Sequence, residues 1–333
     1  MQLKQGLGKL MAAYGALAAV GLTIFLWSSA FVGIRAALEE YTPGFLVLFR
    51  YLVASAVLLV YAMLTGMRLP EKRDLPAILL FGLLGFTVFN LGVSYGAVGV
   101  SAGSTSLLVG TAPIFTALLA AAFLKERLRV LGWLGICVSF IGAALISFGE
   151  GKGLHFEPRA LLVLLAAASE SVYFVMQKPY LRRYGPIEFT AYAVWAGTFF
   201  MLIFSPGLVG EVRNASLGAT LTVVYLGVFP AVVAYASWTY ALSCASASRV
   251  ASSLYVMPVL TFLIGWWWLG EVPGSITVLG GVIALLGVVL ANARKKGAEK
   301  TESLAAESVE QADHLLPGTR TTTHSETTGT PRR

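Results

Sequence analysis

Charged residues are scarce in this chain. Asp, Glu, Lys and Arg make up only 12% of its 333 residues, whereas 57% of the residues are hydrophobic. Soluble domains carry about 25% charged residues, so the composition excludes an ordinary soluble enzyme and also a disordered protein. Long apolar runs take the place of charge, and they predict a membrane protein that crosses the bilayer several times.

Cysteine and histidine are also rare. Cys137 and Cys244 lie inside apolar runs, which indicates packing residues rather than a disulfide. His155 falls in a loop, and His314 and His324 fall in a polar tail. We therefore expect no metal site, no cofactor and no intramembrane catalytic centre. The phosphate-binding pattern GxxxxGK[ST] is missing as well, which predicts that the chain does not hydrolyse ATP itself.

Apolar segments of the length of a spanning helix, about 20 residues, follow one another along most of the chain. They predict ten transmembrane helices, at 10–33, 44–64, 75–97, 101–124, 130–148, 159–178, 187–205, 217–242, 247–269 and 274–293. The flanking residues 1–9 and 294–333 are polar. The second of these stretches is rich in Thr, Glu and Ser and is predicted to be a disordered tail.

Positive charge lies mostly on one side of the predicted helices. The basic residues on that side are Lys4, Lys9, Arg68, Lys72, Arg73, Lys125, Arg127, Arg129, Lys178, Arg182, Arg183, Arg249, Arg294, Lys295 and Lys296. The other side has Arg35, Lys152, Arg159 and Arg213. Because cytoplasmic loops collect Lys and Arg, both termini are predicted to be cytoplasmic. The same rule explains the net charge of +7 without a nucleic-acid partner.

The second half of the chain repeats the first. PIFTALLAAAFLKE at 113–126 matches PVLTFLIGWWWLGE at 258–271, with the same spacing from Pro to Glu. Further pairs in this register, 145 residues apart, are Gly135 with Gly280 and Gly142 with Gly287. Near the start of each half the offset is 143 residues, which aligns Arg35 with Lys178 and Pro43 with Pro186.

Each half is predicted to hold five helices, so the second copy enters the membrane from the opposite side. The predicted organisation is a five-helix repeat at 10–148, a periplasmic connector at 149–158 and a second repeat at 159–293. Inverted repeats of this kind are typical of transporters, with a binding site near the bilayer midplane between the repeats.

Several motifs then point to a family. They are FLWSSAFVGIR at 25–35, SAGSTSLLVGTAPIFTALLAAAFLKERL at 101–128 and SRVASSLYVMPVLTFLIGWWWLGE at 248–271. Together they resemble the EamA-type exporters of the drug/metabolite transporter superfamily, over about residues 10–293. The resemblance implies ten helices, alternating access and efflux of amino acids, related metabolites or drugs across a bacterial inner membrane.

Glu170 departs from the pattern of this family, because it stands where the repeat aligns it with Trp27. It lies near the centre of the sixth predicted helix, where a carboxylate is expensive and faces a cavity, pairs with a cation or stays protonated. Tyr173 and Gln177 share its helix face. Glu170 is thus a candidate for proton coupling. A neutral Glu bonded to a neighbouring helix, or a pair with Arg50, is the structural alternative.

Arg50 lies seven residues into the second predicted helix, about 10 Å deep at 1.5 Å per residue. Snorkelling to the surface or an ion pair is one interpretation, and contact with substrate is the other. Arg50 and Glu170 are hypothesised to meet the carboxylate and the ammonium of an amino acid. The repeat aligns Arg50 with Ala193, so this charge is not duplicated.

Polar side chains form stripes on the third and eighth predicted helices, which indicates either a lined substrate path or hydrogen bonds between packed helices. The candidate path residues on these helices are Asn90, Ser94, Tyr235, Trp238 and Thr239, and Trp27 on the first predicted helix is a further candidate.

Two repeat-related prolines, Pro113 and Pro258, fall inside predicted helices, where they are candidates for hinges or for static kinks. Gly92 and Gly96 allow a close helix approach, either within the bundle or in a homodimer. The sequence leaves both choices open.

The sequence therefore predicts a secondary transporter in the bacterial inner membrane, with a small molecule as substrate and protons as a candidate coupling ion. Export of an amino-acid-like or amphipathic metabolite is the leading interpretation. Import or antiport of a related metabolite, and a receptor or scaffold that moves no solute, are the alternatives.

Overall fold

The computed structural model describes residues 2–123, 130–150, 156–181, 183–244 and 253–292. Every regular element in these ranges is a helix, and no strand occurs among them. Part of the predicted connector, at 151–155, and the predicted tail at 294–333 lie outside the described residues, so both remain predictions.

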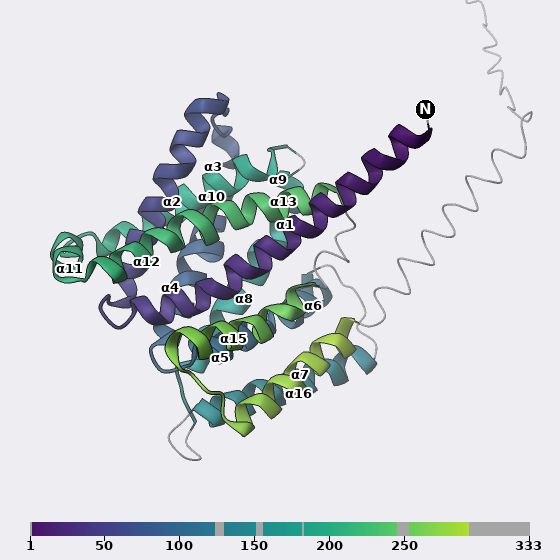
Figure 1. Cartoon of the computed structure of the whole chain (residues 1–333), viewed down its shortest axis with the longest axis vertical. Helices are drawn as coiled ribbons and strands as arrows, with labels where there is room; N and C mark the ends of the chain where they lie inside the picture. The colour runs from purple at the N-terminus through teal and green to yellow at the C-terminus, as the bar shows by residue number, and fades with distance from the viewer. Residues whose placement is uncertain (1, 124–129, 151–155, 182, 245–252, 293–333) are drawn as a thin grey trace, which may run out of the picture. The chain divides into compact units, whose positions relative to one another are not determined.

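The first half of the chain forms helices α1 (Gln2–Ala37), α2 (Pro43–Thr65), η1 (Lys72–Asp74), α3 (Leu75–Gly82), η2 (Leu83–Val88), α4 (Phe89–Ala97), α5 (Ala102–Val109), α6 (Ala112–Phe123) and α7 (Val130–Glu150) (Figure 1). The second half forms α8 (Ala160–Met176), α9 (Lys178–Leu181), α10 (Pro186–Met201), η3 (Leu202–Phe204), α11 (Leu208–Asn214), α12 (Leu217–Val228), η4 (Phe229–Val233), α13 (Ala234–Cys244), η5 (Ser253–Val256), α15 (Met257–Leu269) and α16 (Ser275–Asn292).

Several helical stretches are long and apolar enough to cross a membrane. They are Tyr14–Ala37, Pro43–Thr65, Lys72–Ala97, Val130–Glu150, Ile187–Phe204 and Leu217–Trp238. Shorter apolar helices cover Ala160–Met176, Ser253–Leu269 and Ser275–Leu290. Length and composition therefore support a helical membrane protein, whereas the count of ten helices and the cytoplasmic termini remain predictions.

The predicted segment 101–124 is broken, which corrects the expectation of one continuous helix. A turn at Gly110 and Thr111 separates α5 from α6. Pro113 lies in the first turn of α6 and Pro258 in the first turn of α15, not in a helix interior. The first turn accommodates proline because its missing N–H has no partner to lose there.

Two helices contain a π-helical turn at equivalent places in the two halves. The helix α3–η2–α4 has its π turn at 83–88, and the helix α12–η4–α13 has its π turn at 229–233. A shift of 145 residues superimposes the two turns along the sequence. π turns release carbonyl groups from the regular hydrogen-bond ladder and are frequent at functional sites.

The two larger clusters of buried apolar side chains in the described residues join these helices. One is built mainly from α2, α10 and the α3–η2 helix, and the other mainly from α1, α4, α5 and α8. Each cluster contains residues from both halves, so neither half has a separate core.

Helices α7 and α16 lie side by side and touch through glycines (Figure 1). A Cβ atom on Gly142 would collide with the backbone of Ala284, and a Cβ atom on Gly287 would collide with the backbone of Ser139. A shift of 145 residues converts Gly142 to Gly287 and Ser139 to Ala284. The two contacts are therefore one contact with the partners exchanged, as a two-fold relation produces.

The glycines at 92 and 96 pack inside the bundle. A Cβ atom on Gly92 would meet Leu162 and Ala166, and a Cβ atom on Gly96 would meet Val163, all on α8. These two glycines therefore serve the close approach of α4 to α8.

We expect G142A and G287A to destabilise the protein by about 1–3 kcal/mol each, because the added methyl group meets backbone that cannot move aside. G21A is the matched control, since a Cβ atom on Gly21 meets nothing within 4 Å. Thermal unfolding of the three purified variants in detergent measures the effect. Equal midpoints for G142A and G21A would contradict the packing described for α7 and α16.

An exposed carboxylate ties the loop after α1 to the start of α12. Glu40 accepts hydrogen bonds from the backbone N–H of Ser216 at 2.5 Å and from its hydroxyl at 2.7 Å. These two hydrogen bonds hold the pKa of Glu40 below its usual value, and the bond from the backbone N–H has the larger effect. The ionised carboxylate therefore stabilises the folded state above the unfolded-state pKa, and this contribution is lost as the pH falls through the folded-state pKa.

The difference in stability between the parent protein and E40Q is accordingly expected to shrink as the pH falls from about 5 to about 3. Unfolding midpoints recorded across this pH range provide the measurement. E39Q is the control, because the neighbouring Glu39 side chain makes no hydrogen bond within the described residues. A difference that stays constant with pH would show that Glu40 contributes nothing through its charge.

Candidate functional site

Helix α1 crosses the second half at the π turn η4. The indole Nε1 of Trp27 donates a hydrogen bond to the Pro230 carbonyl at 3.2 Å. The Trp27 ring also contacts the rings of Tyr235 and Trp238, with centroids 5.3 and 5.4 Å away. Three predicted path residues thus meet where a π turn releases a backbone acceptor.

Helix α8 crosses the first half at the π turn η2. The Ser169 hydroxyl donates to the Leu84 carbonyl at 2.8 Å. The Tyr173 ring lies against Gly85, where a Cβ atom would overlap the ring. Since α1 and α8 begin the two halves, the two crossings correspond to each other, and Gly85 is required by the close approach of Tyr173.

Phe86 connects the two crossings. It is fully buried, and its ring contacts Tyr51, Tyr173 and Tyr235 at centroid distances of 5.9, 5.5 and 6.2 Å. Sequence reasoning missed Phe86 and Tyr51, because an aromatic residue inside an apolar run gives no signal of its own. The only sequence signal for Phe86 is its position one turn before Asn90 on the predicted polar stripe.

Phe86, Tyr51, Tyr173 and Tyr235 form an aromatic cluster. Arg50 lies next to this cluster and is only 6% exposed. Its Nε donates to the Leu226 carbonyl at 3.3 Å, and an Nη donates to Oδ1 of Asn90 at 3.2 Å. Its Cζ atom lies 5.4 Å from the centre of the Tyr51 ring. In a regular α-helix the Leu226 carbonyl would bond to the N–H of residue 230, which is a proline and has none.

Neither structural alternative for Arg50 is found. A 6% exposed side chain does not reach the surface, so the snorkelling interpretation is wrong for this structure. No ion pair between Arg50 and Glu170 occurs among the described residues. Asn90 and a backbone carbonyl hold the guanidinium instead, and both partners are uncharged.

Glu170 is half-buried on the face of α8 that carries Tyr173. Its carboxylate takes part in no hydrogen bond or ion pair within the described part of the chain. Tyr51 and Tyr235 lie within the electrostatic reach of both Glu170 and Arg50. The two ionisable side chains therefore lie near one aromatic cluster without pairing with each other.

The remaining predicted residues are less well connected. The Ser94 hydroxyl is buried and has no hydrogen-bond partner among the described residues. Gln177 is half-buried just after the end of α8. The side chain of Thr239 lies outside the described residues. Pro113 and Pro258 lie in the first turns of α6 and α15.

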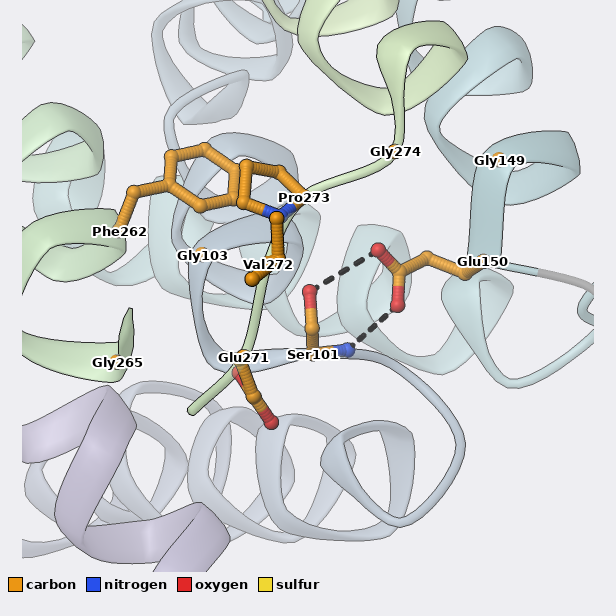
Figure 2. Close-up of a pocket in the computed structure, with 10 residues that line it drawn as sticks. All are labelled: Ser101, Gly103, Gly149, Glu150, Phe262, Gly265, Glu271, Val272, Pro273 and Gly274. Atoms are coloured by element: carbon orange, nitrogen blue, oxygen red, sulfur yellow. Dashed lines mark hydrogen bonds between the residues drawn. The ribbon is translucent and has the colours of Figure 1, made fainter. Parts of the chain in front are cut away.

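A polar junction, separate from the aromatic cluster, surrounds the N-terminus of α5 (Figure 2). Glu150, at the end of α7, accepts hydrogen bonds from the Ser101 N–H at 2.8 Å, the Ser101 hydroxyl at 3.0 Å and the Ser104 hydroxyl at 2.5 Å. A carboxylate is stabilised there by the free N–H groups and the positive end of the helix.

Glu271, after α15, completes this junction from the other half of the chain. It accepts a hydrogen bond from the Ala102 N–H at 2.9 Å and forms an ion pair with Arg35 at 3.2 Å. Arg35 also donates to the carbonyls of Ala97 and Val98 at the end of α4. Sequence reasoning missed this connection, because it joins residues far apart in the chain.

A cavity of about 190 Å³ lies beside Glu150 and Glu271. Its wall includes Gly103, Phe262 and the segment from Val272 to Gly274 (Figure 2). Among the described residues, no group of three His, Cys, Asp or Glu side chains is placed to hold a metal ion.

The sequence matches the EamA-like transporter family twice, over residues 13–148 and 158–293. An uncharacterized transporter of Bacillus subtilis, YdfC, is 49% identical over 267 residues, which cover 80% of this chain and 87% of that protein. A probable terminal-alkyne amino-acid exporter of Streptantibioticus cattleyicolor is 39% identical over 86% of this chain and 96% of that protein. An uncharacterized inner membrane transporter of Escherichia coli, YedA, is 30% identical over 85% and 91%.

One solved crystal structure has the same fold, with a TM-score of 0.57 over 85% of this chain and 98% of the other. The identity of 19% means that this likeness concerns the fold alone. The sequence matches, the relatives and the apolar helices agree with one another. The chain belongs to the EamA-like transporter family and is a multi-pass transporter of the cell membrane.

Proposed function

We propose that this protein is a secondary transporter that exports amino-acid-like or small amphipathic metabolites by alternating access. The observation that carries the proposal is the aromatic cluster with Arg50 and Glu170 near it, two ionisable side chains that form no ion pair with each other within the described residues. Such a cluster suits a solute with a polar end and an apolar body. The relative from Streptantibioticus cattleyicolor is named for an amino acid of this kind.

The proposed scaffold is a pair of inverted five-helix repeats, 10–148 and 159–293, with both termini in the cytoplasm. Three observations support it. The family matches twice, the π turns η2 and η4 occupy equivalent positions, and the α7–α16 contact recurs with its partners exchanged. Transporters built from inverted repeats bind substrate between the repeats and rock one against the other.

Glu170 is the proposed coupling group. An ionisable side chain within a spanning helix is retained at a cost and marks a proton or substrate pathway by default. This carboxylate is free of protein partners within the described residues, so a proton or a substrate ammonium can occupy it in turn. Trp27, Tyr173, Tyr235 and Trp238 are the proposed walls of the same path.

The junction at α5 is proposed to hold the two halves of the chain together on the periplasmic face. Arg35 and α5 belong to the first half, whereas Glu271 belongs to the second. Rocking of two repeats separates them on one face at a time. The Arg35–Glu271 ion pair and the Glu271–Ala102 hydrogen bond must therefore break when this face opens.

We expect E170Q to lower export roughly tenfold, which corresponds to about 1.4 kcal/mol, and to remove its dependence on external pH, because glutamine cannot exchange a proton. Untargeted metabolite comparison of the medium identifies the exported solutes, using cells that carry the parent protein, E170Q, E39Q or an empty vector. E39Q is the matched control and should export like the parent.

Full export by E170Q with an unchanged pH profile would remove the coupling role of Glu170 and leave export itself standing. No difference between the parent protein and the empty vector, with the protein present in the membrane, would contradict export. Uptake of a solute, or a receptor role without transport, would then become the better interpretation.

We expect E271Q to open the periplasmic face more often, because the uncharged amide weakens the bond to Arg35. Thr105 on α5 is a suitable reporter position, since its hydroxyl is buried and makes no hydrogen bond within the part of the chain that the structure describes. In a background with Cys137 and Cys244 changed to serine, T105C should react several-fold faster with a membrane-impermeant maleimide when E271Q is added. The exposed-loop change E39Q should not alter this rate. An equal rate for T105C alone, with E271Q and with E39Q would show that Glu271 does not hold the periplasmic face closed.

A further inference from the structure

Arg50 is a buried cation that has no acidic partner among the described residues. Its side chain is 6% exposed, and no carboxylate among the described residues lies within ion-pair distance of it. A guanidinium inside a membrane protein is costly unless an anion neutralises it. The partners it does have, the Asn90 side chain and the Leu226 carbonyl, carry no charge.

These two partners fix the orientation of the guanidinium. Asn90 is itself held in place, because its amide nitrogen donates to the Phe86 carbonyl at 2.8 Å. That leaves its Oδ1 atom as the acceptor that faces Arg50. The Leu226 carbonyl is held by the helix that contains Pro230. Arg50 is thus positioned from two helices, α4 and α12, other than its own.

The donors that remain match a carboxylate. A guanidinium has five N–H groups, and the hydrogen bonds to Leu226 and Asn90 occupy the Nε–H and one Nη–H. The other three make no hydrogen bond within the described residues. A planar guanidinium with free N–H groups binds both oxygens of a carboxylate in a bidentate manner. The Ser94 hydroxyl, one turn beyond Asn90 on α4, is a second buried polar group without a partner.

We infer that Arg50 is the carboxylate-binding group of the transport site and that Asn90 is its positioning residue. The inference rests on the proposed function and narrows the substrate class to monocarboxylates with an apolar body. The rings of Tyr51 and Phe86 lie beside that body. Glu170, on another helix and unpaired with Arg50, is left for the ammonium group or the proton.

The substitution N90D tests this inference without removing Arg50. An aspartate at this position supplies the missing anion, so it should raise or preserve the thermal midpoint while it blocks Arg50 for ligands. A purely structural role for Arg50 predicts the same stability but unchanged ligand binding, so ligand binding distinguishes the two roles. N214D is the matched control, since Asn214 is exposed at the end of α11.

The ligand arms use pentanoate and its uncharged isostere pentanamide with purified protein in detergent. Pentanoate should raise the thermal midpoint of the parent protein and of N214D, and pentanamide should not. In N90D the apparent affinity for pentanoate should fall roughly tenfold or more, as expected for loss of a buried charge contact. No stabilisation of the parent by pentanoate, or equal stabilisation of N90D, would overturn the inference.

The metabolite comparison separates this inference from the proposed function. Binding of pentanoate that depends on Asn90, in a protein that exports nothing, would retain the carboxylate site and reject export. Export of solutes without a carboxylate, by a protein that ignores pentanoate, would retain export and reject the carboxylate site. Export confined to carboxylates and lost in N90D would support both.

Discussion

Inside a bilayer, a backbone carbonyl released from its helix must find a donor within the protein, because no water is available to replace it. This constraint governs the centre of the molecule. Pro230 and the π turn η4 release acceptors, and donors from other helices reach them, with Arg50 bonding to Leu226 and Trp27 bonding to Pro230 itself. Ser169 does the same at the equivalent turn η2. The side chains that satisfy these carbonyls are thereby fixed around the candidate site.

The scaffold is close to symmetric, whereas the chemistry at its centre is not. Each half contains a π turn that is crossed by the first helix of the other half, and the glycine contact between α7 and α16 recurs with its partners exchanged. Yet Trp27 corresponds to Glu170, and Arg50 corresponds to Ala193. Each charge is therefore present once, on a framework that supplies two similar positions. In the proposed mechanism, the repeated framework provides the movement and the unmatched residues provide substrate recognition.

Helix α1 connects the candidate site to the junction at α5. It is continuous from Trp27 to Arg35, a rise of about 12 Å at 1.5 Å per residue. Trp27 contacts the π turn η4, and Arg35 holds Glu271 at the start of α5. A rigid helix that carries both residues couples any displacement at the aromatic cluster to the contacts at the junction. Helix α1 thus links the proposed substrate site to the Arg35–Glu271 ion pair on the proposed periplasmic face.

Composition, apolar run length and internal repetition were enough to identify a helical membrane protein of this family, because those properties can be read along the chain. The repeat also singled out Glu170, because aligning the two halves places this carboxylate at the position equivalent to Trp27. The break at Gly110, the central place of Phe86 and the burial of Arg50 required the tertiary structure. They depend on which helix faces cross and on which freed carbonyl needs a donor, and neither is encoded in the local pattern of hydrophobicity.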